Sequence, residues 1–187
     1  MSNPGLYDVF PSDMNVATVA RAIGKGIVPT GIQTNYTAPI TRLEFAQMAV
    51  LFIEYFSGQS IDAFMLANTI TPRAAGSFRD TNDPAALAAL ALGITNGTGS
   101  SHFSPDLEIT REQAATMLQR LWTVTGLPIA NNVPSEIDDL DDASAWAVES
   151  INFIRGNAIM ADAAEGSFNP LGSFTREQAV VTFDRIW

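Results

Sequence analysis

The sequence predicts a mainly α-helical fold built from three copies of one helix-loop-helix repeat. Three segments share a pattern in which a Thr-Arg pair is followed closely by an acidic or amide residue and then by apolar residues. The segments are Ile40-Thr41-Arg42-Leu43-Glu44-Phe45-Ala46, Ile109-Thr110-Arg111-Glu112-Gln113-Ala114-Ala115 and Phe174-Thr175-Arg176-Glu177-Gln178-Ala179-Val180. Their arginines are 69 and 65 residues apart. Self-similarity at a nearly fixed period is the signature of a repeat architecture.

Each copy extends upstream through two further shared features. An isoleucine precedes an aromatic residue by nine positions, and the pairs are Ile27 with Tyr36, Ile94 with Phe103, and Ile159 with Phe168. In the last two copies the aromatic residue opens a Phe-x-Pro element. Further upstream, an aspartate stands two positions after an apolar residue, at Asp8, Asp80 and Asp139. The same order of features, three times over, argues against chance similarity.

Each threonine of a Thr-Arg pair stands where a helix should begin, because an apolar-periodic run follows it. Three residues later comes Glu44, Gln113 or Gln178, which completes a capping box. The pattern therefore predicts helices at 41–56, 110–124 and 175–187. A second helix should precede each loop, at 15–24, 84–92 and 143–155, with Asp83 as the cap of the middle one. A short helix is expected at 61–68.

The composition indicates a folded protein and excludes several functional classes. Of the 187 residues, 47% are hydrophobic and 16% are charged, as in globular domains. The absence of cysteine excludes disulfides, thiolate metal sites and cysteine nucleophiles. A net charge of −10 argues against nucleic-acid binding and against adsorption to anionic membranes. No apolar run approaches the roughly 20 residues that span a bilayer, and residues 1–10 lack the features of a signal peptide.

The cations of this acidic chain are Lys25 and nine arginines. The planar arginine fork binds carboxylates and phosphates through paired hydrogen bonds, so this bias suggests recognition of specific anionic groups. Ordinary surface ion pairing gives the same composition and remains the alternative.

In these motifs the chain resembles the S-layer homology family, whose repeats fix bacterial surface proteins to the cell wall. The resemblance rests on the three Thr-Arg helix starts, the Phe-x-Pro elements and Phe78-x-Asp80, and it covers nearly the whole chain. It implies a pseudo-threefold assembly around a central three-helix bundle. The repeats would occupy 1–57, 78–125 and 137–187, joined by linkers at 58–77 and 126–136.

The resemblance also implies a non-catalytic, monomeric module outside the cell, at the cell wall or surface, with neither a cofactor nor a metal. Grooves between adjacent repeats would bind a secondary cell-wall polysaccharide, often a pyruvylated one, or another wall glycan. S-layer or other surface proteins are further candidate partners. The rival interpretation is a protein-interaction or lattice-building module that has the same fold but has lost glycan binding.

The residues that the resemblance assigns to ligand binding are the motif arginines and the upstream aspartates. They are Arg42, Arg111, Arg176, Asp8, Asp80 and Asp139. An arginine at a helix N-terminus would offer a carboxylate both its guanidinium fork and free backbone N–H groups. The alternative is that these arginines and aspartates form structural ion pairs between the repeats.

The copies are not equivalent. Thr41 follows Tyr36 by five positions, whereas the other two copies have a spacing of seven. Leu43 stands where the other copies have a glutamate, and Asp162 stands where repeat two has Gly97. Because the Asp162 carboxylate could repel an anionic ligand, we expect one or two working grooves rather than three.

Other chemistry receives little support. His102 is the only histidine and lies in a polar loop, which favours a solvated side chain over a catalytic one. The acidic run 138–142 lacks the ligand spacing of a calcium loop, and its charges are better explained as support for a helix starting at Ala143. Glu136 and this run could also form a glycosidase pair, but no second acidic cluster supports that chemistry.

Overall fold

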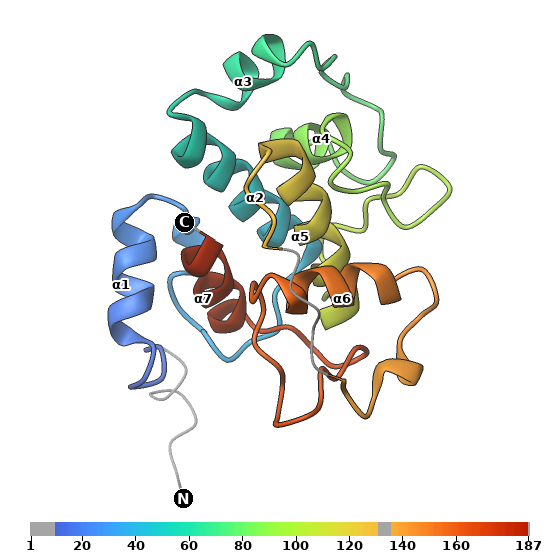
Figure 1. The fold of residues 1–187 in the computed structure, drawn as a ribbon. Coiled ribbons are helices and arrows are strands. Elements are labelled where there is room, and N and C mark those ends of the chain that lie inside the picture. The colour runs from blue at the N-terminus through green and yellow to red at the C-terminus, as the bar shows by residue number, and fades with distance from the viewer. Residues whose placement is uncertain (1–9, 131–135, 187) are drawn as a thin grey trace, which may run out of the picture. The chain divides into compact units, whose positions relative to one another are not determined.

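The computed structural model describes residues 10–130 and 136–186, and within them it contains seven α-helices and only isolated β-bridges (Figure 1). The helices are α1 (Val16–Gly24), α2 (Arg42–Ser57), α3 (Ile61–Ala67), α4 (Pro84–Ala91), α5 (Arg111–Thr125), α6 (Val148–Gly156) and α7 (Arg176–Ile186). The chain forms two compact units, Met1–Glu108 with Thr175–Trp187, and Ile109–Phe174. The mainly α-helical class is confirmed, while the pseudo-threefold arrangement and the repeat boundaries stay predictions.

The three helices that begin at the Thr-Arg motif have the predicted start. In α2, the Glu44 N–H donates to Thr41 Oγ1 at 3.3 Å, and the Thr41 N–H donates to Glu44 Oε2 at 3.0 Å. The same reciprocal pair opens α5 and α7, with Gln113 and Gln178 as the returning side chains. The capping box therefore occurs three times, and it satisfies two backbone donors on each occasion.

The helices that precede the loops match the prediction in two copies and differ in the third. Helices α1 and α4 lie where expected, and Asp83 caps α4 by accepting the Ala85 N–H at 2.8 Å. Helix α6, however, begins at Val148 rather than Ala143, because residue 143 is extended and the preceding Leu140–Asp142 form a 3₁₀ turn. The prediction that the acidic run supports the first turn of this helix is therefore wrong.

In the first unit, α7 packs against both α1 and α2. The Phe183 ring of α7 lies 5.3 Å from the Phe45 centroid and 5.9 Å from the Phe52 centroid. Lys25 directly follows α1, and its Nζ lies 3.2 Å from a carboxylate oxygen of Asp184 in α7, which is almost fully buried. Aromatic packing thus joins α7 to α2, and an ion pair joins α7 to the residue that follows α1.

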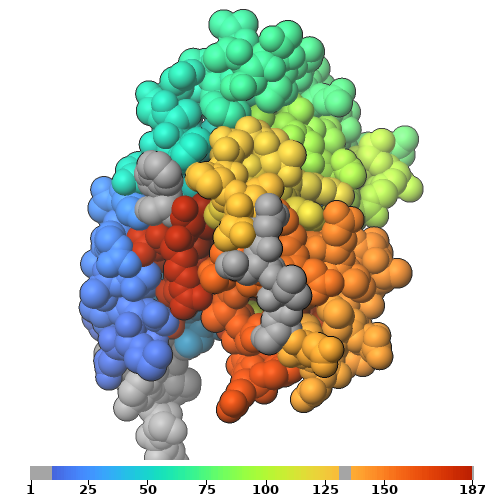
Figure 2. All heavy atoms as spheres, in the orientation of Figure 1, coloured from blue at the N-terminus to red at the C-terminus, as the bar shows by residue number. Residues whose placement is uncertain are grey.

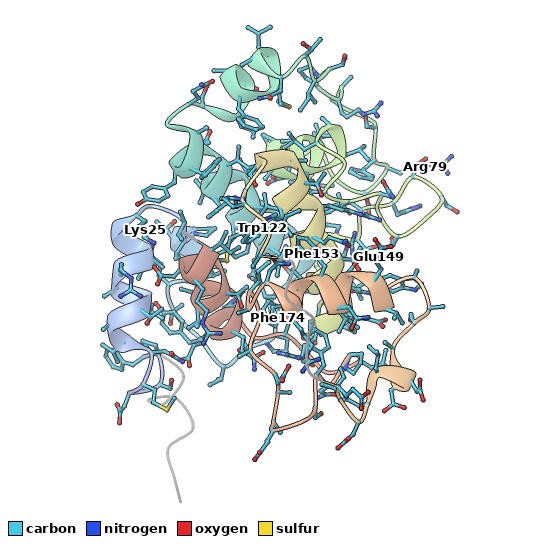
Figure 3. All side chains as sticks on the ribbon, viewed as in Figure 1. Lys25, Arg79, Trp122, Glu149, Phe153 and Phe174 are labelled. Carbon is cyan, nitrogen blue, oxygen red and sulfur yellow. The ribbon has the colours of Figure 1, made fainter. Side chains whose placement is uncertain are left out.

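In the second unit, α5 packs against α6. Trp122 of α5 and Phe153 of α6 meet edge to face, with ring centroids 6.2 Å apart (Figure 3). Ile151 and Ile154 of α6 are fully buried, as the helical spacing of apolar residues requires. The Trp122 indole N–H donates to the Leu127 carbonyl at 3.0 Å, which satisfies the polar atom of this ring.

Across both units, a Thr-Arg helix packs against the first helix of the next repeat. Helix α2 contacts α4, α5 contacts α6, and α7 contacts α1. The packed pairs therefore combine residues from two successive repeats, so one repeat taken alone would leave its apolar face uncovered.

The end of α6 carries a local backbone cost. Ala158 has φ +54°, whereas the corresponding Gly93 after α4 has φ +72°. A left-handed conformation is strained for alanine but not for glycine. We therefore expect Ala158→Gly to raise the free energy of unfolding by about 0.5–1 kcal/mol, measured by urea denaturation.

The matched control is Gly93→Ala, which should lower the free energy of unfolding. A Cβ atom at this position would meet nothing within 4 Å, so the change probes the backbone conformation alone. An Ala158→Gly protein no more stable than the parent would contradict the assignment of strain.

Candidate functional site

The predicted site residues lie where the start of one Thr-Arg helix meets the loop of the next repeat. In the first unit, Arg42 Nε donates to the Phe103 carbonyl at 2.9 Å and Nη2 donates to Thr95 Oγ1 at 2.7 Å. The guanidinium lies over the Phe103 ring, 5.4 Å from its centroid. Arg42 is only 5% exposed, so this side chain is part of the packing beneath the loop.

Arg111 repeats this geometry in the second unit. Its Nε donates to the Phe168 carbonyl at 2.6 Å, and its Nη2 donates to the Ala161 carbonyl at 2.7 Å. The guanidinium lies 4.7 Å from the Phe168 centroid, and Arg111 is 3% exposed. Burial lowers the pKa of this guanidinium from its ordinary value, and the charges of Asp162 and Asp139 partly offset that effect.

The upstream aspartates bind the backbone N–H groups of the same phenylalanine residues. Asp80 accepts the N–H groups of Phe103 and Ser104 at 2.9 and 2.7 Å. Asp139 accepts those of Phe168 and Asn169 at 2.9 and 2.7 Å, and also the Ser167 hydroxyl at 2.6 Å. Asp8 lies outside the described residues. Asp80 and Asp139 thus each bind the same phenylalanine as a motif arginine does: Phe103 is shared with Arg42, and Phe168 is shared with Arg111.

We name these two groups the Arg42 cluster and the Arg111 cluster. The Arg42 cluster comprises Arg42, Asp80, Thr95 and Phe103; the Arg111 cluster comprises Arg111, Asp139, Ala161 and Phe168. In each, the phenylalanine N–H is bound by an aspartate and its carbonyl by an arginine. The clusters therefore fix the position of the loop relative to the helix start.

Hydrogen bonding lowers the pKa of both aspartates. For Asp80, the backbone N–H of Phe103 has the largest effect and keeps the pKa below its ordinary value of 3.8 despite some desolvation. For Asp139, burial opposes ionisation, but the Ser167 hydroxyl and the N–H groups of Phe168 and Asn169 together outweigh it and lower the pKa. Both carboxylates are therefore charged at neutral pH.

The first backbone N–H groups of the Thr-Arg helices are already occupied. The N–H groups of Arg42 and Leu43 donate to the Leu107 and Pro105 carbonyls. The same two positions in α5 donate to Gly172 and Pro170, and in α7 to Ala38 and Tyr36, at 2.9–3.0 Å. The prediction of free helix N-terminal donors for a ligand is wrong, because carbonyls from the next loop satisfy them.

Arg176 occupies a different environment from the other two motif arginines. Its Nη2 lies 2.5 Å from Glu44 Oε1, and its Nη1 donates to the Thr34 carbonyl at 3.4 Å. This is the inter-repeat ion pair that the sequence left open as an alternative. The shorter spacing in repeat one places Tyr36 so that its carbonyl accepts the Glu177 N–H rather than the arginine side chain.

Two glutamates have a role that the sequence argument missed. Glu112 accepts the Ser144 N–H and hydroxyl at 2.8 and 2.9 Å, and Glu177 accepts those of Ser12 at 2.7 and 2.6 Å. A usable signal was present, since Ser12 and Ser144 stand four positions before the equivalent starts of α1 and α6.

Asp162 is also paired. Its carboxylate accepts hydrogen bonds from Arg155 Nε at 2.9 Å and Nη2 at 3.2 Å. Its side chain is 33% exposed, whereas that of Arg155 is 6% exposed. Asp162 therefore forms a partly exposed ion pair close to Arg111.

The remaining candidates do not assemble a reactive site. His102 is exposed, and its ring contacts only the Ser100 carbonyl among the contacts that the structure shows, at 3.0 Å. Within residues 10–130 and 136–186, no three His, Cys, Asp or Glu side chains gather as metal ligands would. The acidic run instead supplies Asp139 to the loop.

Comparison with known protein families agrees with this arrangement. A sequence model of the S-layer homology domain matches residues 81–115 and 136–180, which contain both Phe-x-Pro loops, Arg111 and Arg176. Residues 81–115 and 136–180 belong to the S-layer homology family. The match covers parts of the second and third copies; the first copy lies outside it and stays a prediction, although it has the same capping box. No curated protein matches the chain.

S-layer homology domains are non-catalytic modules that anchor proteins to cell-wall polysaccharide, so the expectation of no enzymatic activity is confirmed at the family level. The family also implies a location at the cell surface or cell wall. Among the described residues, no helix combines the length and the apolar character needed to cross a bilayer.

The hydrogen bonds of Asp139 should make stability depend on pH. A carboxylate with a lowered folded-state pKa stabilises the protein above its unfolded pKa, near 3.8, and loses this contribution as pH falls through the folded value. We expect Asp139→Asn to lower the free energy of unfolding at pH 7 by about 1 kcal/mol. The difference from the parent should shrink as pH falls below 3.8, measured by urea denaturation.

Asp141→Asn provides the control, because this substitution removes the same charge from an exposed side chain. An equal loss of stability for both variants would show that net charge, rather than the bonds to the loop, causes the effect.

Proposed function

We propose that this protein, which contains S-layer homology repeats, anchors an attached or neighbouring polypeptide to an anionic, pyruvylated secondary cell-wall polysaccharide through the Arg42 and Arg111 clusters. The observation that carries the proposal is the buried guanidinium of Arg111, whose hydrogen bonds go to two neutral carbonyls. It supplies positive charge beside an exposed loop in a protein of net charge −10.

The charge of Arg111 is incompletely compensated. Among the described residues, no carboxylate lies within 4.0 Å of it, since the ion pairs of the structure involve other cations. Burying a cation without an anionic partner is costly, so an anion that approaches this guanidinium gains more than one at the solvated surface. The lowered pKa of Arg111, caused first by burial, reflects the same cost.

A route for such contact is available at Nη1. The two hydrogen bonds use Nε and Nη2, and no described residue accepts from Nη1. Because the described part of the chain has no fully buried side-chain nitrogen without a partner, Nη1 reaches the surface. A ketal carboxylate could accept from Nη1 while the loop contacts remain intact.

The other arginines divide according to their partners. Arg42 has the same helix position and the same loop contact as Arg111, which supports a second binding cluster. Arg176 is bound by the Glu44 carboxylate, so an anionic sugar would have to displace an internal ion pair. Asp80 and Asp139 serve in this proposal as positioning residues, because their oxygens bind loop N–H groups.

The protein-interaction alternative is supported by that same Arg176–Glu44 pair, in which a carboxylate of the protein itself binds a motif arginine. Co-sedimentation with purified Gram-positive walls distinguishes the two functions. Glycan anchoring predicts binding that disappears after hydrofluoric acid strips the secondary polymer. Absence of binding to walls from several sources would favour the protein-interaction function.

The clusters are tested by the double variant Arg42→Gln/Arg111→Gln. Glutamine keeps one donor for the loop carbonyl but removes the charge, so wall affinity should fall roughly tenfold or more, as expected for loss of charge-assisted hydrogen bonds. Arg176→Gln is the control and should bind walls as the parent does. Circular dichroism and thermal melting establish that each variant is folded.

The proposed cluster assignment predicts a difference between these two variants. A folded double variant that sediments with walls like the parent would remove both clusters from glycan binding. A loss of binding confined to Arg176→Gln would move the site to the Arg176 region.

A further inference from the structure

The Arg42 and Arg111 clusters have the same construction but differ in one charged position. Each has an arginine beneath a phenylalanine carbonyl and an aspartate on the phenylalanine N–H. Three residues after the aligned isoleucine, the loop beside Arg42 has Gly97, whereas the loop beside Arg111 has Asp162. The loop beside Arg111 thus carries a carboxylate at the position where the loop beside Arg42 carries glycine.

Two contacts hold Asp162 in place, one made by its own side chain and one made by the residue before it. Its carboxylate binds Arg155 of α6 at 2.9 and 3.2 Å, and the preceding residue, Ala161, presents its carbonyl to Arg111 Nη2 at 2.7 Å. The loop between α6 and α7 lies at the surface (Figure 2), and residues 161–165 are exposed. Asp162 is therefore an ordered anion at the edge of the Arg111 cluster.

The Asp162 charge influences the pKa of the Arg111 guanidinium. After burial, which lowers the pKa of Arg111, the attraction of Asp162 is the largest opposing influence. A charge that stabilises the guanidinium in the free protein also repels any second anion that approaches the same guanidinium.

We infer that Asp162 is a specificity-determining residue: its fixed carboxylate competes with the carboxylate of an acidic glycan at Arg111. The Arg111 cluster then binds an acidic sugar more weakly than the Arg42 cluster does, and the two clusters are unequal sites. This inference rests on the proposed glycan binding and adds a rank order to it.

The substitution Gly97→Asp, which would add a carboxylate beside Arg42, does not give a clean test of this inference. Gly97 has φ +77°, and a Cβ atom there would lie 2.3 Å from the His102 carbonyl oxygen. An aspartate at that position would distort the loop in addition to adding charge. The test therefore removes the charge at Asp162 instead.

The experiment follows the Arg42 and Arg111 Nε–H resonances by nitrogen-15 NMR while the full chain is titrated with a defined probe. The probe is the methyl glycoside of N-acetylmannosamine carrying a 4,6-pyruvyl ketal, and its neutral methyl ester shows which changes require the carboxylate. Asp162→Asn keeps an oxygen that can accept from Arg155 but removes the charge. Asp141→Asn removes an equal charge from an exposed position outside the Arg111 cluster.

In the parent protein, the Arg42 resonance should respond at a lower probe concentration than the Arg111 resonance. Asp162→Asn should lower the Arg111 midpoint about fivefold, and added salt should reduce that gain. The Arg42 midpoint should stay unchanged in this variant, and Asp141→Asn should leave both midpoints unchanged.

Three results would overturn the inference, and they separate it from the proposed function. If both arginines respond but Asp162→Asn leaves the Arg111 midpoint unchanged, or raises it, the competition is absent while glycan binding stands. If Asp141→Asn has the same effect as Asp162→Asn, net charge is the cause. If neither resonance responds in any variant and walls are not bound, the competition and the proposed function fail together.

Discussion

The structure depends on the way the start of each Thr-Arg helix is inserted into the loop of the next repeat. Two backbone N–H groups at each start donate to loop carbonyls, and the capping threonine accepts a third. In the Arg42 and Arg111 clusters the side chain adds a bond to a phenylalanine carbonyl and covers its ring. The donors that a helix normally leaves unsatisfied thus become the connection between successive repeats.

The local parts of this arrangement could be predicted from the sequence, because they depend on neighbouring residues. The capping boxes at Thr41 and Thr110 need only a partner three residues away, and helix positions follow from apolar periodicity. The partners of Glu112 and Asp139 could not be predicted in this way, since they lie about 30 residues along the chain. The predicted start of α6 was wrong for the same reason, because Ser144 binds Glu112 instead of joining a helix.

The repeats use different carboxylates to hold the segment at the start of the next repeat's first helix. Glu112 and Glu177 bind the serine that precedes the first helix of the following repeat. Leu43 cannot do this, and the following repeat instead begins α4 directly with its own cap, Asp83. A carboxylate supplied by the preceding repeat is therefore replaced by one supplied locally. The sequence irregularities of repeats one and two are thus linked, since the loss of one acid accompanies the gain of the other.

The same reasoning limits what the motif arginines can do for a ligand. An arginine whose Nε and Nη2 hold a loop carbonyl and its neighbour cannot offer its full fork to a sugar carboxylate, because release of those bonds would also release the loop. The proposed ligand contact would therefore use the remaining donor and the positive potential of the buried charge. Potential at that point is set by the residues around it, namely Glu44 beside Arg176 and Asp162 beside Arg111. Since the arginine itself is common to all three copies, the proposed glycan binding predicts that differences in affinity among them follow these neighbouring carboxylates.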